Sequence, residues 1–202
     1  LYEPDGFYHY AVIKAAIKNH FVIPEYLNLS GWPAHTYISE PHGFYWVTLF
    51  PYLILHSIDS SISAYTVMRL VPILFGIFDV LGAWLLARHI SKNRLFGLLV
   101  MLFVALSMGD AARTSALIYR GDGFVTIFLI LSLLFFVKVL KEDNQRKRLI
   151  YAFLSGFLLS GGNFVWNGAP FATATYVFAF MVVLLYGFVS YKKKIVDRGS
   201  YL

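Results

Sequence analysis

Two arginines and an aspartate stand in a short polar stretch between two apolar segments. The stretch runs from Arg113 to Asp122 and includes Arg120, with apolar residues 95–108 before it and 123–140 after it. A carboxylate beside guanidinium groups at the edge of a bilayer is suited to holding a metal ion, a phosphate group, or both. The same arrangement is also typical of an ion pair that only shapes a turn, because charges within membranes usually pair. The residues alone leave both interpretations open.

A second acidic group lies near the start of the chain. Asp5 follows Glu3 and precedes residues 7–17, whose apolar spacing is helical. Carboxylate oxygens are the ligands that hard divalent cations prefer, so Asp5 and Asp122 are candidates to share one ion. An aspartate before a helix is also a usual N-cap, and Asp5 fits that position as well.

A third polar stretch is the tight turn from Trp166 to Pro170, between two apolar segments. Tryptophan favours the membrane interface, and proline suits the first position of a helix. The turn is therefore either a simple anchor or part of a site. Asp79 lies inside an apolar segment, and we expect it to pair within the bundle.

The composition indicates which elements must position these residues. The chain is 58% hydrophobic and 14% charged, whereas soluble domains have about 25% charged residues. Long apolar runs that do not alternate predict membrane helices and not barrel strands. The absence of cysteine excludes disulfides and thiolate metal sites. A net charge of +6 is typical of cytoplasmic loops in a membrane chain, so we expect no nucleic-acid partner. The predicted fold class is an all-α, polytopic membrane helical bundle.

Residues 65–202 are predicted to form a transmembrane bundle of about five helices, and residues 1–64 an external loop with short helices. The predicted spans are residues 65–87, 95–112, 123–140, 149–166 and 170–191. Segment 44–58 is short and contains Pro51, so we expect it to lie in the interface or to re-enter the membrane. Because the chain starts at Leu1 and stops after a basic run, we expect a fragment of a longer protein.

The positions of Lys and Arg predict the orientation of these helices. Most of the 17 basic residues fall in three loops, around residues 88–94, 138–148 and 192–198. Such loops face the cytoplasm. Three polar stretches then gather on the outer face: residues 2–10, 113–122 and 163–170.

The ordered set of motifs resembles the catalytic subunits of oligosaccharyltransferases. Asp5-Gly-Phe-Tyr-His9 resembles the element with Asp, two aromatics and His in their first external loop. The stretch from Arg113 to Asp122 resembles their second external loop, although Arg120 stands where the family has the first acidic residue of a pair. Trp166-Asn-Gly-Ala-Pro-Phe171 resembles a turn two helices later. The archaeal branch of the family looks closest.

This resemblance implies the transmembrane domain of a C-type glycosyltransferase that carries out N-glycosylation. Such enzymes transfer an oligosaccharide from a dolichyl-phosphate or dolichyl-diphosphate donor to the Asn of an Asn-x-Ser/Thr sequon. The resemblance implies a divalent cation, Mg²⁺ or Mn²⁺, which stabilises the charge of the leaving phosphate. The implied partners are the lipid-linked oligosaccharide, an acceptor protein with a sequon, and membrane lipids. The implied location is the plasma membrane for an archaeal protein, and otherwise the endoplasmic reticulum.

The resemblance also implies roles for individual residues. Asp5 would ligate the metal and approach the acceptor amide, and Asp122 would be the second ligand or its support. Arg113 would steady the carboxylates or the donor phosphate. The predicted substrate-binding residues are Arg120, Trp166, Tyr8 and His9. The family's later glutamate-bearing loop and its Trp-Trp-Asp domain do not occur in these residues, so we expect this piece alone to be inactive.

Two other functions remain open from the sequence. One is another transferase that uses a polyprenyl-phosphate sugar, similar to protein O-mannosyltransferases. Those proteins carry an adjacent Asp-Glu pair in the first loop, whereas this chain has Glu3-Pro-Asp5. The other is a transporter or scaffold whose charges are structural, which predicts internal repeats and broken membrane helices. Neither feature is clear in the sequence.

Overall fold

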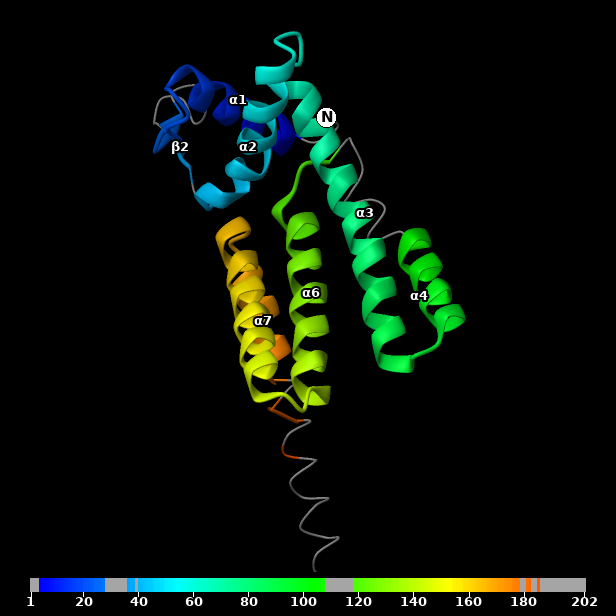
Figure 1. Ribbon diagram of the computed structural model, residues 1–202. Helices are drawn as coiled ribbons and strands as arrows, with labels where there is room; N and C mark the ends of the chain where they lie inside the picture. Colours follow the sequence, from blue (N-terminus) through cyan, green and yellow to red (C-terminus); the bar gives the residue numbers. More distant parts are fainter. Residues whose placement is uncertain are drawn as a thin grey trace, which may run out of the picture. The chain divides into compact units, whose positions relative to one another are not determined.

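The computed structural model describes residues 4–27, 36–38, 40–107, 118–178, 181–182 and 185 (Figure 1). The chain divides into two compact units, Leu1–Asn167 and Gly168–Leu202. In the second unit, residues 169–178 are helical. Helices dominate the described residues of both units, which confirms the predicted all-α class. The exception is a short antiparallel pair of strands, β1 (Tyr26–Leu27) and β2 (Thr36–Tyr37).

Three described helices of the first unit are long and apolar enough to cross a membrane. They are α3 (Ala64–Ser91), α6 (Gly121–Lys141) and α7 (Gln145–Val165). Their positions agree with the predicted spans at 65–87, 123–140 and 149–166. The apolar helix α4 (Arg94–Leu106) is shorter. It coincides with the first part of the predicted span at 95–112, and residues 108–117 lie outside the described part of the chain.

Polar caps determine where these helices begin and end. The Ser63 hydroxyl accepts a hydrogen bond from the Thr66 backbone N–H at the start of α3, and Asn144 caps α7 in the same way through Lys147. At the end of α3, Lys92 adopts the left-handed conformation with φ 56°. The adjoining Asn93 then caps α4 by accepting from the N–H groups of Leu95 and Phe96. Such caps satisfy backbone donors that lack a partner within the helix.

Small residues let the membrane helices approach one another closely. A Cβ placed on Gly162 of α7 would lie 2.8 Å from Cγ2 of Val125 in α6, and one on Gly82 of α3 would lie 2.9 Å from Cδ1 of Ile127. Glycine at such contacts is typical of helix pairs in membranes, which associate through close backbone packing. Asp79 is completely buried in α3, as expected for an intramembrane charge that faces the bundle interior.

Two further helices pack against the N-terminal part of α3. Helix α1 spans Pro4–Lys18, and α2 spans His42–Ile58 with Pro51 inside it. Their shared core with α3 contains the buried residues Val12, Ile13, Ala16, Phe44, Tyr45, Leu49, Val67, Met68 and Val71. Because α1 begins at Pro4, Asp5 lies in its first turn and not at the N-cap. The 17 residues of α2 agree with a helix too short to span.

The two ends of the bundle in the first unit differ in charge. Helices α3 and α6 begin, and α7 ends, on the side where α1 and α2 lie (Figure 1). The opposite ends carry Arg88, Lys138, Lys141 and the basic first turn of α7. The Lys141 ammonium donates to the His89 backbone carbonyl at 2.9 Å and so joins the ends of α6 and α3. That these basic ends face the cytoplasm stays a prediction.

Candidate functional site

Parts of the three polar stretches that were predicted to share the outer face come together among the described residues of the first unit. The ring centroids of His9 in α1 and Tyr119 before α6 lie 6.0 Å apart. A Cβ on Gly121 at the start of α6 would lie 2.6 Å from Cδ1 of Trp166 at the end of α7. At the start of α2, Gly43 packs directly against Phe164 of α7. Residues distant in sequence therefore surround the first turn of α6.

Asp122 is the acidic side chain at this meeting point. It lies in the first turn of α6, where the helix dipole favours a negative charge. Its carboxylate oxygen Oδ1 is 3.4 Å from Nε of Arg120, whose side chain is 51% exposed while that of Asp122 is 10% exposed. The site thus presents a shielded carboxylate next to a guanidinium group that reaches solvent.

Hydrogen bonds hold the residues before Asp122 against α2. The buried hydroxyl of Tyr119 donates to the Phe44 backbone carbonyl at 3.0 Å and lies 2.7 Å from Oγ1 of Thr48. Burial raises the pKa of Tyr119, so its phenol stays neutral and keeps its proton for this bond. On the other side of Asp122, Phe124 packs against Phe75 of α3 with ring centroids 4.8 Å apart. Asp122 is therefore carried on backbone fixed from both sides.

His9, a predicted substrate-binding residue, lies in an aromatic core. Its ring is edge-on to Phe44 at 4.6 Å, and its Nδ1 atom is 3.3 Å from the Tyr45 hydroxyl. His9 is only 8% exposed. These contacts hold α1 against α2, so the structure gives His9 a packing role, and its substrate contact stays a prediction.

Tyr8 and Tyr45 form the more polar side of the same region. Tyr8 is half-buried, and its burial together with the nearby charge of Glu40 raises its pKa. The pKa of Tyr45 is raised mainly by burial, with further contributions from Tyr8, Glu40 and Tyr119. Both phenols are therefore neutral hydrogen-bonding groups at physiological pH. The substrate-binding role predicted for Tyr8 is untested.

Trp166 lies at the end of α7 and is half-buried. Its backbone N–H donates to the Gly162 carbonyl at 3.1 Å, which closes the helix. Its indole lies over Gly121, one residue before Asp122. Trp166, the first residue of the turn that the sequence left as an anchor or a site element, therefore lies against the residue next to Asp122.

Two predicted site residues fall at the limits of the described structure. Arg113 lies in residues 108–117, outside the described part of the chain. Asp5 lies one helical turn before His9, but its side chain is outside the described part. Among the side chains that are described, no group of three or more His, Asp or Glu residues could hold a metal ion. The Asp122 carboxylate is one donor of the type that Mg²⁺ and Mn²⁺ take, and the predicted sharing of an ion with Asp5 remains a prediction.

No motif in the sequence marks Tyr119, Thr48 or Phe44 as parts of the site. Their hydrogen bonds join residues 71 and 75 positions apart in the chain. No local spacing reports such a contact. Trp166 was predicted as a site residue, but its contact with Gly121, beside Asp122, could not be predicted from the sequence.

Comparison with known proteins adds an independent line of support. Residues 1–201 match the family described as oligosaccharyl transferase STT3, N-terminal. Dolichyl-phosphooligosaccharide-protein glycotransferase 1 of Pyrococcus furiosus is 28% identical over 193 residues, which are 94% of this chain and 18% of that protein. The Pyrococcus horikoshii protein of the same name is 30% identical over 173 residues, 84% of this chain and 17% of that protein. The chain thus spans less than a fifth of the length of these relatives. No solved structure matches it.

Proposed function

The chain belongs to the oligosaccharyl transferase STT3 family, and on this premise we propose that it is the N-terminal membrane part of an oligosaccharyltransferase catalytic subunit. The proposed reaction is N-glycosylation, in which an oligosaccharide moves from a dolichyl-phosphate or dolichyl-diphosphate donor to the Asn of a sequon. The observation that supports this most is the shielded Asp122 carboxylate at the start of α6, beside Arg120 and below the Trp166 turn. This site lies at the end of the bundle that lacks the basic helix ends.

Asp122 is the proposed metal ligand among the described residues, with Asp5 as the second. A bound Mg²⁺ or Mn²⁺ would supply positive charge to the leaving phosphate. The carboxylate is suited to this role because it is fixed by the Tyr119 and Phe124 contacts and is shielded from bulk water. A preorganised group needs little rearrangement when charge develops in the reaction.

Arg120 is the proposed contact for the donor phosphate. Its guanidinium group is half exposed and lies only 3.4 Å from Asp122. It therefore balances the carboxylate before the donor binds, and it has the planar donor geometry that phosphate oxygens accept. Arg113, from the same segment, is proposed to steady the carboxylates or the phosphate. The family usually has an acidic residue at the position of Arg120, so this contact would be particular to this chain.

Helix α1 is proposed to position the acceptor side of the site. Asp5 lies one turn before His9, and His9 is held by Phe44 and Tyr45. This anchoring fixes the start of α1, where Asp5 would approach the acceptor amide. Tyr8 and Trp166 are half-buried and are the proposed substrate contacts.

The proposed location follows from the relatives and the charge distribution. The similar glycotransferases come from Pyrococcus species, so we place this protein in an archaeal plasma membrane with Asp122 outside. In a eukaryotic cell the corresponding membrane would be that of the endoplasmic reticulum. The basic ends of α3, α6 and α7 would face the cytoplasm.

A transfer assay with the full-length protein tests the proposal. The protein is incubated with a lipid-linked oligosaccharide and a sequon peptide, with added Mn²⁺ or with a chelator. We expect glycan on Asn, loss of transfer with the chelator, and a fall of roughly 100-fold or more for Asp122→Asn. Asp59→Asn is the matched control, because Asp59 is an exposed acid just after α2, and it should keep the wild-type rate.

Three results would contradict the proposal. Glycan on Ser or Thr would favour a transferase of the O-mannosyltransferase type. No transfer under any metal condition would favour a transporter or scaffold. Wild-type transfer by Asp122→Asn would show that this carboxylate is not the centre of the site.

A further inference from the structure

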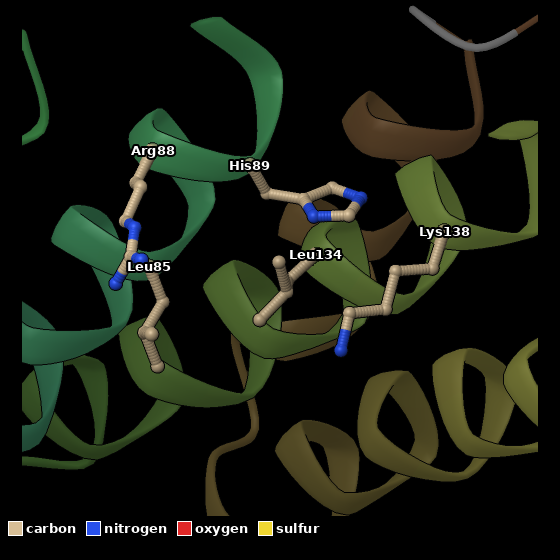
Figure 2. Close-up of a pocket in the computed structure, with 5 residues that line it drawn as sticks. All are labelled: Leu85, Arg88, His89, Leu134 and Lys138. Carbon is tan, nitrogen blue, oxygen red and sulfur yellow. The ribbon is translucent and has the colours of Figure 1, made fainter. Parts of the chain in front are cut away.

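A pocket lies at the end of the bundle opposite Asp122, between the C-terminal parts of α3 and α6. Its volume is about 340 Å³, and the residues lining it are Leu85, Arg88, His89, Leu134 and Lys138. Figure 2 shows the His89 imidazole between the two helices, with Arg88 and Lys138 on opposite sides of Leu134. We call this the α3–α6 pocket. None of its residues belongs to the Asp122 site.

The charges around the α3–α6 pocket favour an anion. Arg88 and Lys138 contribute two positive groups, and no acidic side chain lines the pocket among the described residues. Aromatic neighbours hold both cations: Arg88 lies 5.4 Å from the Trp84 ring centroid, and Lys138 lies 5.5 Å from that of Tyr151. An adjoining pocket of about 150 Å³ adds Lys141 and one acid, Glu142. The lining is therefore basic, and its charged groups are positioned in advance.

His89 supplies a polar group that lacks a partner within the described structure. Its Nε2 atom is buried, and no described residue hydrogen bonds to it. Leaving a buried polar nitrogen without a partner is unfavourable. With the proton on Nε2, the ring would donate to an oxygen placed in the pocket between Arg88 and Lys138. The backbone of His89 is already fixed, because its carbonyl accepts from Lys141.

The pocket is amphipathic along the bundle axis. Leu85 and Leu134 form its apolar part, and both belong to helices of membrane-spanning length. In α3, Leu81 and Leu85 are 44% and 41% exposed, so an apolar surface continues along this helix from the pocket toward the middle of the bundle. The basic groups are at the helix ends, at the level of lipid headgroups. This arrangement matches a molecule with a phosphate at one end and a hydrocarbon chain at the other.

We propose that the α3–α6 pocket binds the phosphate of an anionic phospholipid in the leaflet opposite the Asp122 site. Arg88, Lys138 and the His89 ring contact the phosphate oxygens, and an acyl chain lies along Leu85 and Leu81. Basic pockets between membrane helices on the cytoplasmic side are suited to such headgroups. The lipid would bridge α3 and α6, and so would stabilise the packing of the two helices.

The test measures lipid binding to the full-length protein in detergent by native mass spectrometry and thermal unfolding. Phosphatidylglycerol is the anionic probe, phosphatidylcholine the zwitterionic one, and inorganic phosphate the free anion. We expect retained phosphatidylglycerol and a higher melting temperature with this lipid only. The double variant R88Q/K138Q should weaken its binding on the order of tenfold, since each basic group near the surface adds to the attraction for anionic lipid.

Lys147→Gln is the matched control, because Lys147 is an exposed basic residue on the same side in the first turn of α7. It should bind phosphatidylglycerol like the wild type. Lys138→Arg keeps the charge and should also bind, which separates loss of the phosphate contact from a folding defect. Equal retention of both lipids, or equal weakening by Lys147→Gln, would overturn the proposal. Stabilisation by inorganic phosphate to the same extent as by the lipid would overturn the assignment to a phospholipid.

Discussion

Tyr119 connects the carboxylate of the site to the rest of the molecule. Tyr119 lies three residues before Asp122. Its hydroxyl is hydrogen-bonded to the Phe44 carbonyl and to the Thr48 hydroxyl. All three residues are buried. Removing the Tyr119 hydroxyl would therefore leave the Phe44 carbonyl and the Thr48 hydroxyl without this hydrogen-bond partner, and water could not replace it. Tyr119, which has no predicted role in the chemistry, therefore fixes the position of Asp122, which has such a role.

At Gly121 a single methyl group should disturb the site. Gly121→Ala would place Cβ 2.6 Å from the Trp166 indole, which forces the turn away from the start of α6. We expect a loss of about 1–3 kcal/mol in unfolding free energy, together with slower transfer. Gly156→Ala is the control, because nothing lies within 4 Å of its Cβ. Thermal unfolding of the two purified full-length variants compares their stabilities. Equal melting temperatures would show that the contact between residue 121 and Trp166 is unimportant.

The buried tyrosines should make the fold sensitive to alkaline pH. Burial raises the pKa of Tyr45 and of Tyr119, so the unfolded chain releases these protons first as the pH rises. The stability they contribute is fully present below the unfolded pKa of about 10 and falls as the pH rises above it. Phenolate absorbance measures this, as the difference between wild type and Tyr119→Phe. A difference signal that titrates near pH 10 in the folded protein would contradict the expected shift.

The sequence was sufficient to predict Asp122 and Trp166 as site candidates, because their motifs are local and ordered along the chain. It was not sufficient to predict the environment of His9. An aromatic-rich helix start is compatible with a substrate surface and with a packed core, and only the contacts with Phe44 and Tyr45 distinguish the two. The same limit applied to Tyr119, whose partners lie more than 70 residues away in the chain.

At the scale of elements, α6 and α7 are joined by a reciprocal pair of serines. Ser132 Oγ donates to the Ser155 carbonyl, and Ser155 Oγ donates to the Ser132 carbonyl, both at 2.9 Å. Both side chains are buried between the helices. Hydroxyl groups at such contacts satisfy their donors and hold two backbones at a fixed separation.

The serine pair predicts a coupling between the two substitutions. Ser132→Ala and Ser155→Ala should each destabilise the protein, and the double variant should lose less than the sum of the two. The two Oγ atoms also lie 3.2 Å apart, and because alanine keeps both backbone carbonyls, this contact between the hydroxyls is what couples the two substitutions. We expect a coupling of roughly 0.6 kcal/mol, the average for hydrogen bonds between membrane helices, obtained from a double-mutant cycle of detergent unfolding. Strict additivity would mean that the two hydroxyls act independently. Thr175→Ala is a control, since the exposed Thr175 hydroxyl donates to the Phe171 carbonyl within the same helix.

The helix positions were largely predictable, because continuous apolar runs at α3, α6 and α7 are long enough to span. Their ends were less so. α3 continues to Ser91, four residues past the predicted end at 87, because the helix stops only at the left-handed cap Lys92. α4 ends at Leu106, two residues before the apolar run ends at Met108, and the rest of the predicted span to residue 112 lies outside the described part of the chain. Caps are decided by a few hydrogen bonds, which hydropathy does not report.

At the scale of the molecule, the charge distribution predicts which side is labelled from outside the cell. The 202 residues contain no cysteine, so single cysteines can be introduced in this region without a background. Asp59→Cys, after α2, should react with a membrane-impermeant maleimide on intact cells. Lys147→Cys, in the first turn of α7, should react only after permeabilisation. Both residues are exposed, so access to the side chain itself does not limit the reaction. Labelling in the reverse order would invert the proposed orientation and would place Asp122 in the cytoplasm.

The hydrogen bonds between α2 and Tyr119 bear on how a glycan would reach the Asp122 carboxylate in the proposed reaction. Phe44 and Thr48 of α2 are hydrogen-bonded to Tyr119, three residues before Asp122, so α2 covers the chain on that side of the site. In the proposed reaction, we expect the donor to approach from the side where the half-exposed Arg120 side chain reaches solvent. A tilt of α2 would also move Tyr119 and, with it, Asp122. We therefore expect a partner that binds α2 to change the rate of the proposed transfer without contacting either substrate.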